Sequence, residues 1–285
     1  MEKSIHSWLK EADTRLSPVS ETPSLDVQVL MAAQLNQTRS WVLAHPEQKL
    51  TDGDVSSLEA MLLQMESSTP LPYITGKGYF YGMEFLVTPD VLIPRPETEL
   101  LVEQALAWCQ THSTPQLILD VGTGSGCIAI ALAAHLPGTC VLAIDKSPAA
   151  LRIARNNASF HQVTDRVKFI LSDLTSALSG EFSLICANLP YIPSGTLSKL
   201  PVARTEPKLA LDGGEDGLDQ IRRLVKDALH ITPPDACLLL EIEASQGVAV
   251  RTLAKNIFPD AAVSVLKDLA DHDRLLKIER SGNND

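Results

Sequence analysis

"LILDVGTGSGCIAIALAAHL" (residues 117–136) is the part of the sequence that most clearly indicates a fold class. A short apolar strand passes through a glycine loop directly into an apolar helix. Gly122 allows a tight turn, Gly124 lets a ligand approach the backbone, and Gly126 lets the helix begin close to the strand. The G-x-G-x-G spacing differs from the dinucleotide pattern, and the Lys of a P-loop is missing after it. The loop therefore predicts a ligand site at the edge of a sheet, and the plainer alternative is a structural turn.

Three acidic residues stand at matching positions next to predicted strands. Asp120 precedes the glycine loop, Asp145 ends "CVLAID" and Asp173 follows "VKFIL". A carboxylate at Asp145 can accept both hydroxyls of a ribose, and Asp173 is placed to meet an adenine edge. S-adenosylmethionine has an ammonium, a ribose and an adenine but no phosphate. The three acids therefore favour this cofactor over a nucleotide.

The chain from residue 96 onward alternates apolar strands with helices. The strands are nearly continuous apolar runs, which is typical of a parallel sheet covered on both faces. We therefore predict an α/β, Rossmann-like domain over residues 96–285. The expected strands are 117–121, 140–145, 167–171, 182–188 and 236–243, and the later helices are 217–229 and 246–257.

The preceding residues have a different character. Residues 1–68 carry amphipathic helical patterns, such as the apolar positions 5, 8, 9, 12 and 16, and predict a small all-α domain. Residues 69–95 are rich in Pro, Gly and aromatic residues and predict a linker with a β-hairpin over 78–85. The helical part holds no ligand-like polar cluster, so we expect it to recognise the substrate and not to take part in chemistry.

Composition limits the class of protein. The chain has 285 residues, 45% of them hydrophobic, and a net charge of −11, which argues against a long nucleic-acid-binding face. Its apolar runs are too short for a membrane span and its first residues do not read as a signal peptide. The five cysteines lack metal spacing and predict reduced, buried thiols in a cytoplasmic protein. The seven histidines are dispersed, so we expect no metal site.

"ICANLPYIP" (residues 185–193) ends the fourth strand in an unusual way. We consider a substrate that carries a planar NH2 group, in an amide or an aromatic amine. Its nitrogen is a poor nucleophile because the lone pair is delocalised. Two carbonyl groups would accept the two hydrogens of this NH2 group: that of the Asn188 side chain and that of the Leu189 peptide, which Pro190 fixes. The ring of Tyr191 would pack against the plane of the substrate. The alternative is that these residues only form a turn.

The turn and two further stretches resemble one family. The N-x-P-Y pattern is shared by adenine-N6 DNA methyltransferases, RNA guanine-N2 methyltransferases and protein glutamine-N5 methyltransferases. "VLIPRPETELLVEQAL" (91–106) and "EPKLALDGGEDGLDQIRRL" (206–224) resemble the release factor glutamine methyltransferases, the HemK/PrmC family. The resemblance covers nearly the whole chain. It implies a class I S-adenosylmethionine-dependent methyltransferase that modifies the Gly-Gly-Gln glutamine of class 1 peptide chain release factors.

The resemblance also implies roles for individual residues. The substrate glutamine would be held by Asn188, Leu189, Pro190 and Tyr191, with Asn188, Pro190 and Tyr191 as the catalytic residues and Asn188 also near the methyl donor. The cofactor would be held by the glycine loop and strand-end residues Gly122, Thr123, Gly124, Ser125, Gly126, Asp145, Asp173 and Leu174.

The sequence departs from the family pattern at three positions. Leu189 replaces a usual Pro, and Glu243 and Asp271 each replace a usual Gly, so we expect local backbone differences there. Arg95 and Glu97 have two possible roles, lining the site or starting a helix. The "DGGEDG" segment (212–217) is either a cover over the substrate or a polar loop.

Three other functions fit parts of the pattern. A glutamine methyltransferase of a ribosomal protein shares the turn, but "PRPETE" favours the release factor enzyme. An adenine-N6 DNA methyltransferase would need a target recognition domain, for which the residues after the turn leave no room. A cofactor-binding scaffold without catalysis would not need Asn188, Pro190 and Tyr191.

Overall fold

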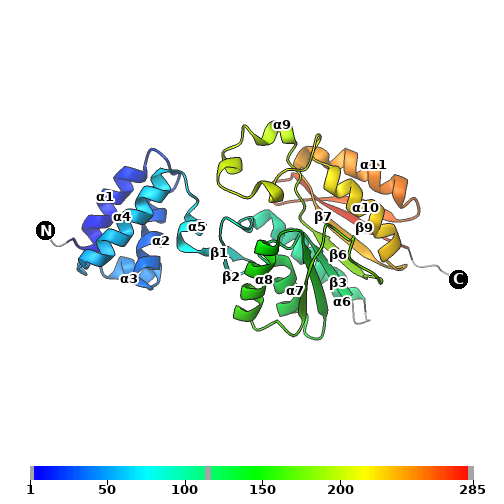
Figure 1. Ribbon diagram of the computed structural model, residues 1–285, viewed down its shortest axis with the longest axis horizontal. Coiled ribbons are helices and arrows are strands. Elements are labelled where there is room, and N and C mark those ends of the chain that lie inside the picture. Colours follow the sequence, from blue (N-terminus) through cyan, green and yellow to red (C-terminus); the bar gives the residue numbers. More distant parts are fainter. Residues whose placement is uncertain (1–2, 113–116, 282–285) are drawn as a thin grey trace. The chain divides into compact units, whose positions relative to one another are not determined.

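The computed structural model of the chain describes residues 3–112 and 117–281 and divides it into two units, Met1–Lys77 and Gly78–Asp285 (Figure 1). The first unit is all-α, and the second carries the sheet that the glycine loop predicts. The combination confirms the predicted fold class, a Rossmann-like domain preceded by a helical domain and a β-hairpin.

The first unit is built around one hydrophobic core. The face of α1 predicted from the sequence is buried, since Ile5, Trp8, Ala12 and Leu16 all have less than 2% of their surface exposed. Ser4 and Thr51 cap α1 and α4 through side-chain bonds to backbone N–H groups, which satisfies donors at the helix starts. The helices are α1 (Ile5–Leu16), α2 (Pro23–Leu35), α3 (Arg39–Ala44), α4 (Asp52–Glu66) and α5 (Leu71–Thr75).

A β-hairpin follows, made of β1 (Lys77–Phe80) and β2 (Met83–Leu86). Its two turn residues, Tyr81 and Gly82, both have positive φ, as in the hairpin turns that match strand twist. The buried Asn157 side chain joins this hairpin to the glycine loop. Its amide accepts from Leu86 N at 2.7 Å and donates to Leu86 O at 3.0 Å and to Ser125 O at 2.8 Å.

Over the described residues, the second unit has a seven-stranded sheet in the order β5-β4-β3-β6-β7-β9-β8. Neighbouring strands from β5 through to β7 are parallel, whereas β9 runs antiparallel to both β7 and β8. The chain leaves β3 for β4 on one side and later returns to β6 on the other. The strands are β3 (Leu117–Val121), β4 (Cys140–Asp145), β5 (Val167–Leu171), β6 (Leu184–Ala187), β7 (Cys237–Glu241), β8 (Ala262–Lys267) and β9 (Asp273–Glu279).

Helices cover both faces of this sheet (Figure 1). Helices α6, α7 and α8 cover one face, and α10 and α11 cover the other, each over its own hydrophobic cluster. The helices are α6 (Glu99–Thr111), α7 (Cys127–His135), α8 (Pro148–Phe160), α9 (Ser194–Leu197), α10 (Asp219–Ile231) and α11 (Gly247–Ile257). Short 3-10 helices are η1 (Pro96–Thr98), η2 (Pro201–Arg204), η3 (Lys208–Ala210) and η4 (Ala244–Gln246).

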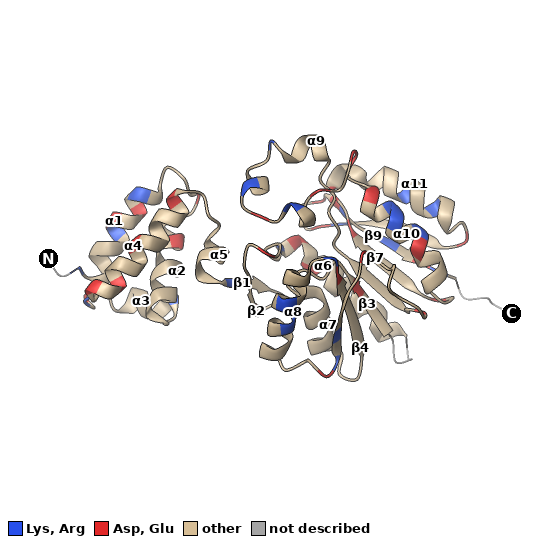
Figure 2. Cartoon of the chain, viewed as in Figure 1, with Lys and Arg blue, Asp and Glu red and all other residues tan. Residues whose placement is uncertain are grey.

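Charged residues of both signs are distributed along the chain. Lys and Arg are interspersed with Asp and Glu along both units in the view of Figure 2. Within the described ranges, no helix is both long and apolar enough to cross a membrane. The expectation of buried thiols is wrong for Cys140, which is exposed at the start of β4, and Cys127 is only partly buried.

Candidate active site

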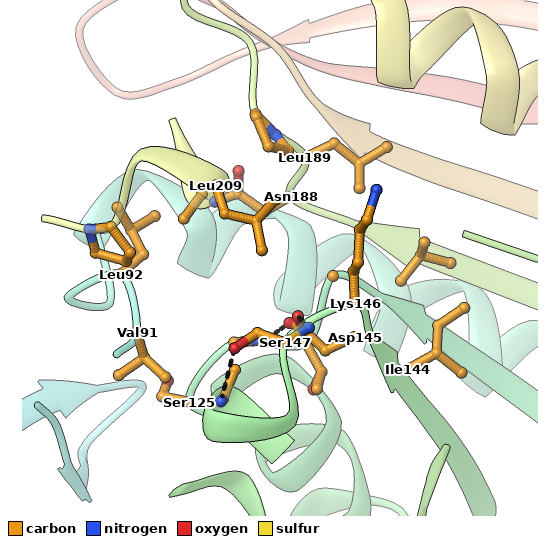
Figure 3. A pocket seen from close by; sticks show the side chains of 18 of the residues that line it. Val91, Leu92, Ser125, Ile144, Asp145, Lys146, Ser147, Asn188, Leu189 and Leu209 are labelled. Carbon is orange, nitrogen blue, oxygen red and sulfur yellow. Dashed lines mark hydrogen bonds between the residues drawn. The ribbon is translucent and has the colours of Figure 1, made fainter. Parts of the chain in front are cut away.

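A pocket of about 600 Å³ opens at the carboxyl ends of β3, β4 and β6 (Figure 3). This is the point where the strand order reverses, which is the usual ligand position in an open α/β sheet. Most of the predicted cofactor and turn residues come together here with segments that lie far away in sequence, but Gly126 and Tyr191 are not among the lining residues. The lining includes Val91, Leu92, Arg95, Thr98, Gly122, Thr123, Gly124, Ser125, Ile144, Asp145, Lys146, Ser147, Asp173, Leu174, Asn188, Leu189, Pro190 and Leu209.

The glycine loop forms the floor of the pocket. The N–H groups of Gly122 and Thr123 both donate to Ile144 O at 2.9 Å, which ties the loop to the end of β4. Gly126 has φ +84, and a Cβ there would lie 2.9 Å from Ile130 Cδ1 and 3.1 Å from Ala154 Cβ. Only glycine lets α7 start so close to its neighbours, as the sequence spacing predicts.

Asp145 reaches into the pocket from the end of β4. Its Oδ2 accepts from Gly124 N and its Oδ1 accepts from Ser147 N, each at 2.8 Å. These bonds fix the carboxylate, and each oxygen can accept one further hydrogen bond. Burial raises the pKa of Asp145, against the opposing effect of the backbone donors.

Asp120 does not line the pocket and lies in the protein interior. Its Oδ2 accepts from Thr123 Oγ1 at 2.6 Å and from Ala129 N at 3.2 Å, so it joins the glycine loop to α7. Its Oδ1 has no hydrogen-bond partner in the described part of the chain. Burial raises the pKa of Asp120 from 3.8 to about 7. The acid before the loop therefore supports the loop and is not a pocket ligand.

This buried carboxyl predicts a pH dependence of stability. Because the pKa of Asp120 is about 7 folded and near 3.8 unfolded, the native state holds an extra proton between these values. Stability should therefore fall as pH rises through this window, by up to about 1.4 kcal/mol per pH unit. Asp120→Asn should flatten this fall, whereas Asp260→Asn, at an exposed position, should not. Denaturant unfolding from pH 4 to pH 8 tests this, and parallel curves for wild type and Asp120→Asn would refute it.

Asp173 and Leu174 lie on the pocket wall after β5. The Asp173 carboxylate pairs with Arg223 at 3.2 Å and with Lys146 at 3.4 Å, and Arg223 holds its pKa below the ordinary value. Leu174 is buried and has φ 49. The carboxylate of Asp173 is thus already engaged by two cations, in contrast to that of Asp145.

The turn after β6 borders two cavities. Asn188, Leu189 and Pro190 line the large pocket, and Asn188 and Tyr191 also line a neighbouring cavity of about 210 Å³. Leu189 is buried, and its Cδ2 would lie 3.2 Å from a Cβ on Gly122. Asn188 therefore stands between the two cavities.

A buried polar network lies behind Asn188. Asn188 Nδ2 donates to Thr98 Oγ1 at 3.0 Å, and Thr98 Oγ1 donates to Glu241 Oε2 at 2.6 Å. Tyr191 OH donates to Glu241 Oε1 at 3.4 Å. Burial raises the pKa of Glu241 and of Tyr191. Our sequence analysis missed Thr98 and Glu241, although a Glu at the end of the apolar run "CLLLE" was a usable signal.

Segment 212–217 packs against the backbone of the turn. Gly217 has φ +80, and a Cβ there would lie 2.2 Å from Tyr191 O. Gln246 Nε2 donates to the same carbonyl at 3.0 Å. The segment is therefore a close packing partner of the turn and more than a polar connection to α10.

The structure also shows where Arg95, Glu97, Glu243 and Asp271 lie. Arg95 lines both cavities and pairs with the buried Glu206, which also accepts from Ile93 N at 3.2 Å. Glu97 is exposed in the first turn of η1. Of the two departures from glycine, Asp271 has φ 64 whereas Glu243 has φ −76 and caps η4, so only Asp271 adopts a glycine-type conformation.

Comparison with known proteins identifies the family. Residues 7–76 match the family described as PrmC N-terminal domain, and residues 97–204 match the methyltransferase small domain. A release factor glutamine methyltransferase from Moorella thermoacetica is 40% identical over 93% of this chain and 95% of its own length. The chain belongs to the release factor glutamine methyltransferase family. The Escherichia coli member is 36% identical over 94% of this chain and 96% of its own length.

Solved structures agree with the family fold. A ribosomal protein L11 methylase from Lactobacillus delbrueckii has a TM-score of 0.50 and 21% identity, covering 68% of this chain and 84% of its own. A SAM-dependent methyltransferase from Agrobacterium tumefaciens has a TM-score of 0.51 and 15% identity, and the match covers 72% of this chain and 69% of its own. At these identities the similarity shows the fold alone. The fold is that of class I methyltransferases, and this family member is a methyltransferase.

Proposed function

We propose that this protein transfers a methyl group from S-adenosylmethionine to the side-chain nitrogen (N5) of the Gly-Gly-Gln glutamine in class 1 peptide chain release factors. The names of its relatives support the reaction and the substrate class. The observation that carries the proposal is Asn188, which stands between two cavities with its Nδ2 bonded to Thr98. Its carbonyl oxygen is thereby left to accept a hydrogen bond from a substrate amide.

The large pocket fits the cofactor. A Cβ on Gly124 would meet no atom closer than Gly122 O at 3.9 Å, so the loop leaves open space beside its backbone. Asp145 is fixed at the pocket wall with acceptor capacity for two ribose hydroxyls. The remaining loop residues, Asp173 and Leu174 would complete the site. When bound, S-adenosylmethionine supplies an electrophilic methyl group.

The turn would orient the glutamine amide. Asn188 Oδ1 and the Leu189 carbonyl accept its two hydrogens, and Pro190 fixes the direction of the second acceptor. Gln246 holds the Tyr191 carbonyl, which keeps the turn in place. Positioning then exposes the nitrogen lone pair to the methyl group. The amide nitrogen loses its proton after it has gained positive character, so no side chain has to act as a general base.

One assay tests this function. Labelled methyl transfer from S-adenosylmethionine to a purified class 1 release factor should occur, and should disappear when its Gly-Gly-Gln glutamine is replaced by alanine. A ribosomal protein and an adenine-containing DNA duplex serve as comparison substrates. Transfer to either of these, with none to the release factor, would refute the proposal.

The first unit would recognise the release factor. All residues lining both cavities belong to the second unit, so removal of residues 1–76 should leave cofactor affinity unchanged. The shortened chain should still methylate a short Gly-Gly-Gln peptide. Its kcat/KM on the intact release factor should drop on the order of tenfold or more, the effect of about 1.4 kcal/mol of lost binding. Undiminished kcat/KM on the intact factor would refute the recognition role.

A further inference from the structure

In the buried network behind Asn188, each hydrogen bond has a defined donor and a defined acceptor. Thr98 and Glu241 are 2% and 1% exposed, and the two hydrogen bonds of the Thr98 hydroxyl, to Glu241 and from Asn188, are 2.6 and 3.0 Å long. A hydroxyl carries one hydrogen, and Thr98 donates it to Glu241 Oε2. The Thr98 oxygen can then only accept, so the group it meets on Asn188 must be the NH2 and not the carbonyl.

The carboxylate end of the network sets this direction. Glu241 accepts from both Thr98 and Tyr191, with one donor on each carboxyl oxygen. A shared buried acceptor orders every donor around it, because an unpaired polar group in the interior is costly. With the Asn188 NH2 held by Thr98, its Oδ1 is turned away from the network.

We propose that Glu241 fixes the orientation of the Asn188 amide through the Thr98 hydroxyl, so that Asn188 Oδ1 faces the substrate amide. The inference rests on the proposed function, in which Asn188 Oδ1 holds the glutamine nitrogen. Thr98 and Glu241 are positioning residues, because they act through Asn188.

Removing the hydroxyl tests the link. Thr98→Val keeps the shape but lets the Asn188 amide turn over, so the single-turnover rate should fall on the order of tenfold to a hundredfold. Cofactor affinity, measured by calorimetry, should stay within about threefold because the substitution leaves the glycine loop and Asp145 with its two backbone donors unchanged. Thr98→Ser retains the hydroxyl and should restore the rate. A normal rate for Thr98→Val would overturn the proposal.

Changing the carboxylate tests the direction. Glu241→Gln has the same shape but gains an NH2 that can donate to Thr98, whose hydrogen is then free to meet Asn188 Oδ1. We expect a loss of rate comparable to that of Thr98→Val, in a variant whose cooperative melting transition shows that it is folded. Glu241→Gln also tests the proposal if Thr98→Val does not fold. A Glu241→Gln rate equal to that of wild type would overturn the proposal.

A double-mutant cycle separates positioning from a purely structural role. If Thr98 acts through Asn188, Thr98→Val should cost nothing further in an Asn188→Ala background. A structural role would cost the same factor in both backgrounds and would overturn the proposal. Binding of a Gly-Gly-Gln peptide by calorimetry gives a readout besides activity, and should weaken in Thr98→Val and recover in Thr98→Ser. Absence of transfer by the wild-type protein would instead refute the proposed function.

Discussion

Asn188→Ala should lower the single-turnover rate of methyl transfer at least about a hundredfold at saturating cofactor. The substitution removes the carbonyl that orients the substrate nitrogen and leaves a substrate amide hydrogen unpaired, which costs a further ~1–3 kcal/mol. It also leaves the Thr98 oxygen without its donor. Cofactor affinity should change far less, because the glycine loop and Asp145 remain in place.

Two comparison variants sharpen this prediction. Asn188→Asp keeps the shape of the side chain, but a charged oxygen takes the place of the NH2 group that donates to Thr98. Methyl transfer by this variant should therefore also be strongly impaired. Asn156→Ala, an exposed asparagine on α8, should have no effect. Rapid-quench measurement with labelled cofactor gives the rates. A near-normal rate for Asn188→Ala would mean that the segment after β6 is only a turn.

Asp145→Ala should weaken S-adenosylmethionine binding by roughly 1.5–3 kcal/mol, which is about tenfold to a hundredfold in Kd. The carboxylate is held by Gly124 N and Ser147 N, and we propose that it accepts the two ribose hydroxyls. Calorimetric titration measures the Kd, and the melting temperature reports whether the variant is folded.

A second acid provides the control. Asp173→Ala should weaken cofactor binding less than Asp145→Ala, because the Asp173 carboxylate is 39% exposed and already pairs with Lys146 and Arg223. Equal effects of the two substitutions would contradict this ranking. An unchanged Kd for Asp145→Ala in a folded variant would remove Asp145 from the cofactor site.

The features that depend on local chemistry could be predicted from the sequence. The strand, glycine loop and helix of residues 117–136 require close approaches that only glycine allows, and Gly126 is in such a position. The hairpin turn contains Gly82, which tolerates positive φ, and Tyr81 beside it adopts positive φ as well. Because parallel strands end at one edge, the residues that follow them, including Asp145 and Asn188, were expected to meet in one pocket.

The pairing of the polar groups could not be predicted from the sequence, because it depends on how distant segments pack. Thr98 is 90 residues from Asn188 and 143 from Glu241 in sequence, and hydrophobic periodicity carries no information about such pairs. The side chain of Asp120 points into the protein interior, and that of Asp173 pairs with Arg223. Both facts depend on which helix covers the end of each strand. Local sequence patterns predict where strands end. The burial of a carboxyl group and its hydrogen-bond partners arise only when distant segments pack together.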